Sequence, residues 1–214
     1  MLVEKNERSC YSLLMAIAAT TDKGSATREM ILDRAYVLAS RKGLEGLSIG
    51  ELAAAAKMSK SGVFAHFGSR EELQLAVLEF GAQRFGERVF VPALREKRGL
   101  PRLRAIVHGW FDWVRENRYG CLLMGAVNEY DARPGPQRDR VVALMELWRS
   151  ECAKAVALAV DARELRADTD ARQFAFEVFG ISLALHQDTR LFDPKLARTQ
   201  AERAFERLIA AHSR

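Results

Sequence analysis

Apolar residues recur every three to four positions along most of the 214-residue chain. This spacing places them on one face of an α-helix, and no stretch shows the strict alternation of apolar and polar residues that is typical of a half-buried strand. The sequence therefore predicts an all-α fold. The predicted helices cover residues 27–42, 49–57, 60–66, 70–90, 103–114, 121–130, 141–159, 170–188 and 194–208.

The two short helices at 49–57 and 60–66 begin at recognisable start signals. Ser48 is followed three positions later by Glu51, which is a capping-box pattern, and Ser59 stands immediately before the second helix. Two short helices joined by a tight turn are typical of a helix-turn-helix, whose second helix enters the DNA major groove. An ordinary helical hairpin with solvated charges would show the same spacing, so the spacing alone leaves both interpretations open.

A longer ordered set of residues resembles the tetracycline-repressor (TetR) family. The resembling segments are Thr27–Leu32, Gly43, Ser48–Leu52, Ser59–Phe67 and Ser69–Leu73. The resemblance covers about residues 27–75, whereas the rest of the chain is similar only in helical layout and length. It implies an N-terminal three-helix helix-turn-helix DNA-binding domain and a larger C-terminal helical domain for ligand binding and dimerisation.

The resemblance also identifies candidate DNA contacts. These are Thr27, Arg28, Ser48, Lys57, Ser59, Lys60, Ser61, Gly62, Phe64 and His66. Three positions depart from the usual family pattern: Lys57 replaces a glycine, Phe64 a tyrosine and Arg70 a lysine. Phe64 has no hydroxyl to offer a phosphate, while Lys57 is either a compensating cation or a tolerated turn residue.

Charge and composition divide the chain into three parts. Residues 25–70 contain seven Lys or Arg and four Asp or Glu, so this segment holds +3 of the formal net charge of +5. We expect it to be the DNA-binding domain, because a basic surplus suits a polyanion. Residues 71–214 form the predicted effector-binding and dimerisation domain. Residues 1–24 are predicted to be a flexible arm, or an extension upstream of the true start.

The C-terminal part is rich in aromatic residues and methionine. The resemblance implies an effector cavity between its helices, and the candidate lining residues are Trp110, Trp113, Met124, Met145, Trp148, Phe179 and His186. Packing into an ordinary core is the simpler interpretation of most of these side chains. The apolar helix 170–188 and the last helix are the candidate dimer surface, with Phe205 and Leu208 at the interface, unless that apolar surplus is buried within one subunit.

Together these features predict a sequence-specific DNA-binding regulator. We expect a homodimeric repressor that binds a palindromic operator in double-stranded DNA and is released by a small, largely apolar effector. The alternatives are an activator, a nonspecific or architectural DNA-binding protein and, less favoured, a helical enzyme.

Several other classes of function find no support in the sequence. Gly46-Leu47-Ser48-Ile49-Gly50 matches the nucleophile elbow of hydrolases, but a helix precedes it where that elbow requires a strand, so we expect no enzyme. The three cysteines form no metal-ligand pattern, and we expect no metal, no cofactor and a reducing cytoplasm. No segment approaches the length of a membrane span.

Overall fold

The computed structural model describes residues 23–117 and 120–214. Within these ranges the chain is helical, and the only β-type pairing is an isolated bridge between Leu165 and Ser213. The all-α prediction is therefore confirmed. Almost the whole predicted N-terminal arm lies outside the described residues. None of the described helices combines the length and hydropathy that crossing a lipid bilayer requires.

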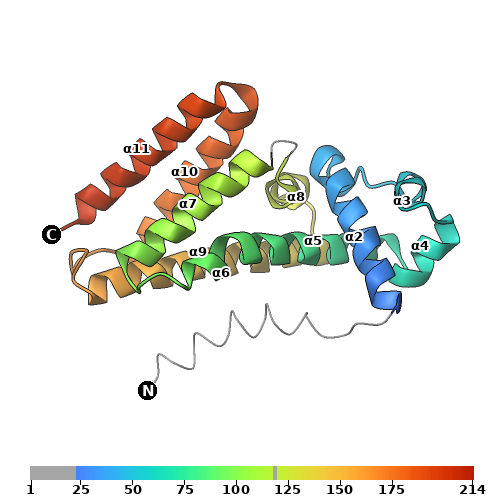
Figure 1. Cartoon of the computed structure of the whole chain (residues 1–214), viewed down its shortest axis with the longest axis horizontal. Helices are drawn as coiled ribbons and strands as arrows, with labels where there is room; N and C mark the ends of the chain where they lie inside the picture. Colours follow the sequence, from blue (N-terminus) through green and yellow to red (C-terminus); the bar gives the residue numbers. More distant parts are fainter. Residues whose placement is uncertain (1–22, 118–119) are drawn as a thin grey trace, which may run out of the picture.

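The first three helices form a small unit, called here the head, at one end of an elongated molecule (Figure 1). They are α2 (Lys23–Lys42), α3 (Ile49–Ala56) and α4 (Lys60–Phe67). The head's buried apolar side chains include Ile31, Leu44, Leu52 and Val63, and they belong to one apolar cluster that continues into the rest of the molecule. The first helix was predicted to begin at residue 27, which is wrong: α2 begins at Lys23.

The fourth helical segment leads from the head into the rest of the molecule (Figure 1). It consists of α5 (Arg70–Phe85), a π-helical turn η1 (Gly86–Phe90) and the short α6 (Val91–Ala93). The helix was predicted to end at residue 90, but the helical path continues through Pro92. Pro92 stands in the first turn of α6, directly after the π-turn, and proline is tolerated in a first turn because the N–H that it lacks would have no helical partner there.

Five further helices build the larger unit, called here the body. They are α7 (Leu100–Glu116), α8 (Leu122–Tyr130), α9 (Pro136–Asp161), α10 (Ala171–Leu191) and α11 (Pro194–His212). Figure 1 shows α5 and α9 running along the long axis, α8 next to the head, and α10 and α11 as an antiparallel pair farther away. Asp170 and Asp193 cap the last two helices with their side chains.

The last helix corrects one prediction about the dimer surface. Phe205 is completely buried within the single chain, where its ring lies edge-on to Phe111 at 6.4 Å between centroids, and Leu208 is 7% exposed. Both side chains belong to the apolar stripe that α11 packs onto its own subunit, so they offer no surface to a partner copy. The exposed apolar side chains lie elsewhere on the pair, including Phe176 and Leu183 of α10 and Leu196 of α11.

Candidate nucleic-acid interface and the body behind it

The helix-turn-helix has a serine cap at the start of each of its two helices and one left-handed residue between them. Ser48 has an extended backbone, and its hydroxyl accepts the Glu51 N–H at 3.5 Å. In a complete capping box the Glu51 carboxylate would also accept the backbone N–H of Ser48. Here that carboxylate pairs instead with the Lys42 ammonium group at 2.7 Å. Lys57 closes α3 with φ 54° and ψ 43°, the left-handed conformation in which glycine is the usual residue.

The start of α4 is the most tightly organised part of the head. The Ser59 hydroxyl accepts the Gly62 N–H at 3.0 Å and lies 3.0 Å from the Ser61 hydroxyl. A Cβ atom at Gly62 would stand 3.2 Å from the Ser59 oxygen and 3.3 Å from the Met58 methyl carbon, so glycine suits this capped turn. The Lys60 side chain lies along Gly50 of α3, where an added Cβ would be 3.4 Å from its Cε.

The two faces of α4 differ in what they contact. Val63 and Phe67 are buried against the head, whereas Lys60, Ser61 and Phe64 are exposed. The predicted recognition residues therefore share one open surface that carries an ammonium group, hydroxyls and the N-terminal end of a helix. Phosphates and base edges are recognised by groups of these kinds.

The other predicted DNA contacts lie around this surface. Arg28 of α2 is exposed, and its guanidinium carbon lies 4.9 Å above the Phe67 ring. Thr27 is half-buried on the same helix, and His66 is half-buried beside Phe67, with 6.4 Å between ring centroids. The structure thus places Arg28 and His66 next to Phe67, at the C-terminal end of α4.

A carboxylate from the body holds the loop that follows α2. Glu129 of α8 accepts the Leu44 N–H at 3.1 Å and the Glu45 N–H at 3.0 Å. The close approach requires Gly43, because a Cβ there would lie 1.7 Å from the Glu129 oxygen, and its φ of 81° is also left-handed. One side chain of the body is therefore hydrogen-bonded to two consecutive backbone amides of the head.

A second set of hydrogen bonds reinforces the same junction. The amide of Gln74, which is buried on α5, donates to the Leu44 carbonyl at 3.0 Å and accepts from Gln137 of α9 at 3.1 Å. The Tyr130 hydroxyl donates to the Glu45 carboxylate at 2.7 Å and lowers the pKa of that carboxyl. The stabilisation is present above the usual pKa of glutamate and is lost as the pH falls through the lowered value.

The predicted effector residues form an aromatic cluster in the body rather than an open cavity. Phe85 of α5 lies at its centre, with ring centroids 5.5 Å from Trp110, 5.6 Å from Trp113 and 4.5 Å from Trp148. Phe179 extends the cluster through Trp110 at 5.8 Å. All five rings are buried, so their contacts are those of an ordinary packed core.

The remaining three candidates occupy separate positions. Met124 is buried on α8, and Met145 is half-buried on α9. His186 on α10 is half-buried, and its Nε2 lies 3.4 Å from Arg190 Nη1. Burial and the nearby Arg190 cation lower the pKa of His186, so its imidazole is neutral at pH 7.

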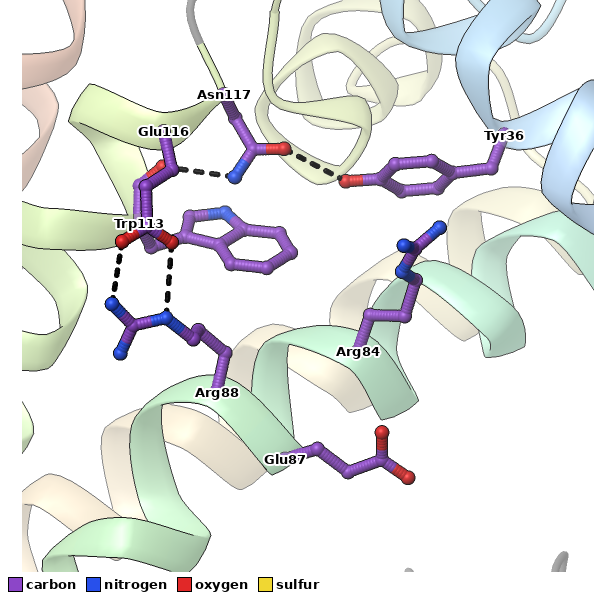
Figure 2. Close-up of a pocket in the computed structure, with 7 residues that line it drawn as sticks. All are labelled: Tyr36, Arg84, Glu87, Arg88, Trp113, Glu116 and Asn117. Atoms are coloured by element: carbon purple, nitrogen blue, oxygen red, sulfur yellow. Dashed lines mark hydrogen bonds and ion pairs between the residues drawn. The ribbon is translucent and has the colours of Figure 1, made fainter.

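An open cleft of about 450 Å³ lies where the head meets the body (Figure 2). It was not predicted from the sequence, because its walls come from α2, from α5 with η1, and from α7. Of the predicted effector residues, Trp113 alone is among its lining side chains. The lining residues are Tyr36, Arg84, Glu87, Arg88, Trp113, Glu116 and Asn117.

Two family models match the chain and together span most of the head and body. The model described as bacterial regulatory proteins, tetR family, matches residues 31–77. The model described as tetracyclin repressor-like, C-terminal domain, matches residues 99–205. A comparison with curated proteins finds no significant match.

Solved structures with the same fold include several transcriptional regulators. A TetR regulator from Chloroflexus aurantiacus is 26% identical with a TM-score of 0.77, covering 88% of this chain and 94% of its own. SCO4454 from Streptomyces coelicolor is 18% identical with a TM-score of 0.78, covering 91% and 98%. AibR, solved with isovaleryl coenzyme A and operator DNA, is 25% identical with a TM-score of 0.67, covering 84% and 98%.

Proposed function

The chain belongs to the tetracycline-repressor family of bacterial regulatory proteins, and from this premise we propose that it is a repressor that an effector releases from its operator. The observation that carries the DNA-binding part is the open face of α4. There Lys60 and Ser61 stand exposed at the capped N-terminus of the second helix of a helix-turn-helix. This is the part of such a motif that contacts base edges.

The proposed DNA surface has two roles divided among its residues. Lys60, Ser59 and Ser61 contact phosphates and bases in the major groove, while Arg28 contacts the flanking backbone. Phe64 is 41% exposed and offers an apolar edge instead of a hydroxyl, which suits contact with a thymine methyl group. Lys57 adds a cation at the turn, and its left-handed backbone holds it at the outer edge of the motif.

The release step requires that the body and the head move together. Glu129 and Gln74 supply direct hydrogen bonds between them, so a shift of α8 or α5 is transmitted to the loop before α3. An effector changes DNA binding only if its affinity for the two arrangements differs. AibR, a regulator of similar fold, is known in complex with isovaleryl coenzyme A and operator DNA.

A palindromic operator requires two copies of the chain, and the exposed faces of α10 and α11 are the proposed interface. Phe176, Leu183, Leu191 and Leu196 are exposed large apolar side chains of these two helices. Gly180 lies between the first two, and a Cβ there would meet nothing within 4 Å. A face of this kind is typical of a surface that a partner covers.

The decisive experiment selects DNA from a random library with the purified protein and then measures its affinity in competition. We expect a two-fold symmetric consensus whose half-sites are about one helical turn apart, roughly 34–36 Å. The selected site should bind at least about a thousandfold more tightly than random DNA of equal length. Equal affinity for both would contradict this function and favour a nonspecific DNA-binding protein.

The direction of regulation is tested separately. A promoter fused to the selected site should be less active with the protein than without it, whereas increased activity would identify an activator.

No turnover is expected at Ser48, because its hydroxyl is held as the cap of α3. Ester hydrolysis that disappears in Ser48→Ala would favour the enzyme alternative.

A further inference from the structure

Helix α2 and the loop that follows it are hydrogen-bonded to the body at two separate places. The loop is held by Glu129 of α8, which accepts the Leu44 and Glu45 amides. Earlier in α2, the Tyr36 hydroxyl donates to the side-chain oxygen of Asn117 at 3.2 Å (Figure 2). Tyr36 and the loop are about two helical turns, roughly 10 Å, apart. Two such contacts fix the direction of the helix, whereas one contact would let it pivot.

Asn117 directly follows α7 and is held by the end of that helix. Its side-chain amide donates to the Trp113 carbonyl at 2.9 Å, and its backbone N–H donates to the same carbonyl at 3.0 Å. Its own carbonyl accepts the Gly120 N–H at 3.1 Å. Every polar atom of Asn117 is therefore engaged, and its side-chain oxygen moves together with α7.

Tyr36 is held on the other side of this bond by α5. Its ring lies edge-on to Phe80 at 6.1 Å between centroids, and the Arg84 guanidinium carbon lies 5.1 Å from the ring centroid. Arg84 also pairs with Asp33 of α2 at 2.8 Å. Burial raises the pKa of Tyr36 to about 12, so the hydroxyl keeps its proton at neutral pH and can donate it to Asn117.

The bond between Tyr36 and Asn117 is the weaker of the two contacts. Its length exceeds the roughly 2.5–3.0 Å that is usual for an O–H···O bond, and an increase of about 0.5 Å would break it. Glu129 instead offers a charged acceptor to two donors, and such bonds are stronger. An open cleft separates α2 from α7 here, so packed side chains do not fix the distance between these helices (Figure 2).

We propose that the hydrogen bond between Tyr36 and Asn117 is a latch that sets the angle of the head, and that the head pivots about Glu129 when this latch opens. Tyr36 and Asn117 are then positioning residues. Neither belongs to the exposed face of α4, but together they determine where that face stands relative to the body. A displacement of the end of α7 is transmitted to α4 through this bond. Its effect on operator binding rests on the proposed function, whereas the latch itself does not, and the two are measured separately.

Distances between spin labels on the head and the body test the latch without DNA. The labels are attached at Ala65→Cys of α4 and Ser150→Cys of α9, which are both exposed positions. Every protein carries Cys10→Ser, and the other two native cysteines are buried. The labelled chain is diluted with unlabelled protein, so that the recorded distances are those within one chain.

We expect one narrow distance distribution with the native latch. Tyr36→Phe and Asn117→Leu should each give a distribution about twice as wide or a second distance, because the head then populates further angles. Tyr36→Phe keeps the buried ring, so the circular dichroism spectrum should not change. Asn128→Ala, which removes an exposed asparagine from α8, is the control and should keep the narrow distribution. An unchanged distribution in both latch variants, or an equal broadening in the control, would overturn the proposal.

The consequence for DNA is measured as the preference for one spacing between half-sites. The selected operator is compared with versions that are one base pair longer or shorter between the half-sites. We expect the native chain to bind the selected spacing about tenfold more tightly than the altered ones, and each latch variant to lower this preference at least about threefold. The variant that combines Tyr36→Phe with Asn117→Leu should show no further loss, because both substitutions remove the same bond.

Each result separates the latch from the proposed function. If the two losses multiply in the combined variant, the residues do not act as a pair and the assignment is wrong. If the label distances change while the spacing preference is constant, the latch stands and its link to operator recognition is wrong. If no operator can be selected, the proposed function fails and the label distances still decide the latch.

Discussion

Lys57 combines a structural cost with a proposed role in DNA binding. Its left-handed backbone is unfavourable for a residue with a side chain by roughly 1–2 kcal/mol, which explains why glycine is usual in the family at this turn. The side chain is exposed next to α4. The buried apolar contacts of α3 and α4 offset this cost in free energy.

Lys60 is the residue whose loss should most directly weaken DNA binding. Lys60→Ala removes an exposed ammonium group from the start of α4, so the operator affinity should fall and the slope of log K against log salt should decrease by about one. Lys195→Ala, which removes an exposed lysine from α11, is the control and should change neither quantity. A salt titration identical to wild type would mean that α4 is not the helix that contacts DNA.

The two serine caps of the head should differ in their contribution to stability. The Ser59 hydroxyl receives its hydrogen bond at 3.0 Å, whereas that of Ser48 receives one at 3.5 Å, the limit of a useful contact. Ser59→Ala should therefore lower the free energy of unfolding by about 1 kcal/mol, and Ser48→Ala by less. Urea denaturation measures both, with Ser150→Ala on α9 as a control. A larger loss for Ser48→Ala would contradict this ranking.

At the scale of elements, α8 is hydrogen-bonded to the loop after α2 and so joins the body to the head. The family resemblance covered the helix before this loop and helical periodicity predicted α8, but neither identified the contact made by the Glu129 carboxylate. Glu129 satisfies two backbone amides, and the partly buried Leu44 amide would be costly to leave unpaired, by about 1–3 kcal/mol.

Glu129→Ala should loosen this junction without unfolding the body. We expect the amides of Leu44 and Glu45 to exchange hydrogen faster, while the amides of α11 keep their wild-type protection. Operator affinity should fall several-fold, because the head is then less well oriented. Glu146→Ala, an exposed acid on α9, is the control. Unchanged exchange at both loop amides would show that the hydrogen bonds to Glu129 do not hold the loop in solution.

At the scale of the whole molecule, α10 and α11 separate the subunit core from the proposed dimer surface. Phe174 and Val178 point into the body and are buried, whereas Phe176 and Leu183 of the same helix are exposed. The helix was expected to be buried on both faces because it is apolar on nearly all sides. Within one subunit only one of those faces is covered, which leaves the other for a partner.

Leu183→Glu should convert the proposed dimer into a folded monomer. Leu183 is exposed in the single chain, so a charge there disturbs an intersubunit contact but not the core. Sedimentation should show wild type as a dimer at micromolar concentration and the variant as a monomer with unchanged helix content. Phe205→Glu is the comparison: it buries a charge in the subunit and should unfold the protein. A monomeric wild type would contradict the proposed interface.

The sequence by itself determined the features that depend on neighbours within about four residues. The caps at Ser48 and Ser59 form as predicted, and Gly43 supplies the left-handed stop after α2. Helical periodicity and these caps define where most helices begin and end, because backbone hydrogen bonds in a helix link residues four positions apart. The all-α class followed from these local signals, whereas the helix-turn-helix also required the ordered family resemblance over residues 27–75.

Only the tertiary structure decided which apolar faces are covered and which distant polar groups meet. Phe205 and Leu183 look alike in a periodic pattern, but one packs inside the subunit and the other is exposed. Glu129 bonds to Leu44 across 85 positions, and the cleft combines Tyr36 with Trp113 from separate units. Such contacts depend on how whole helices are placed against one another, and no spacing along the chain encodes that placement.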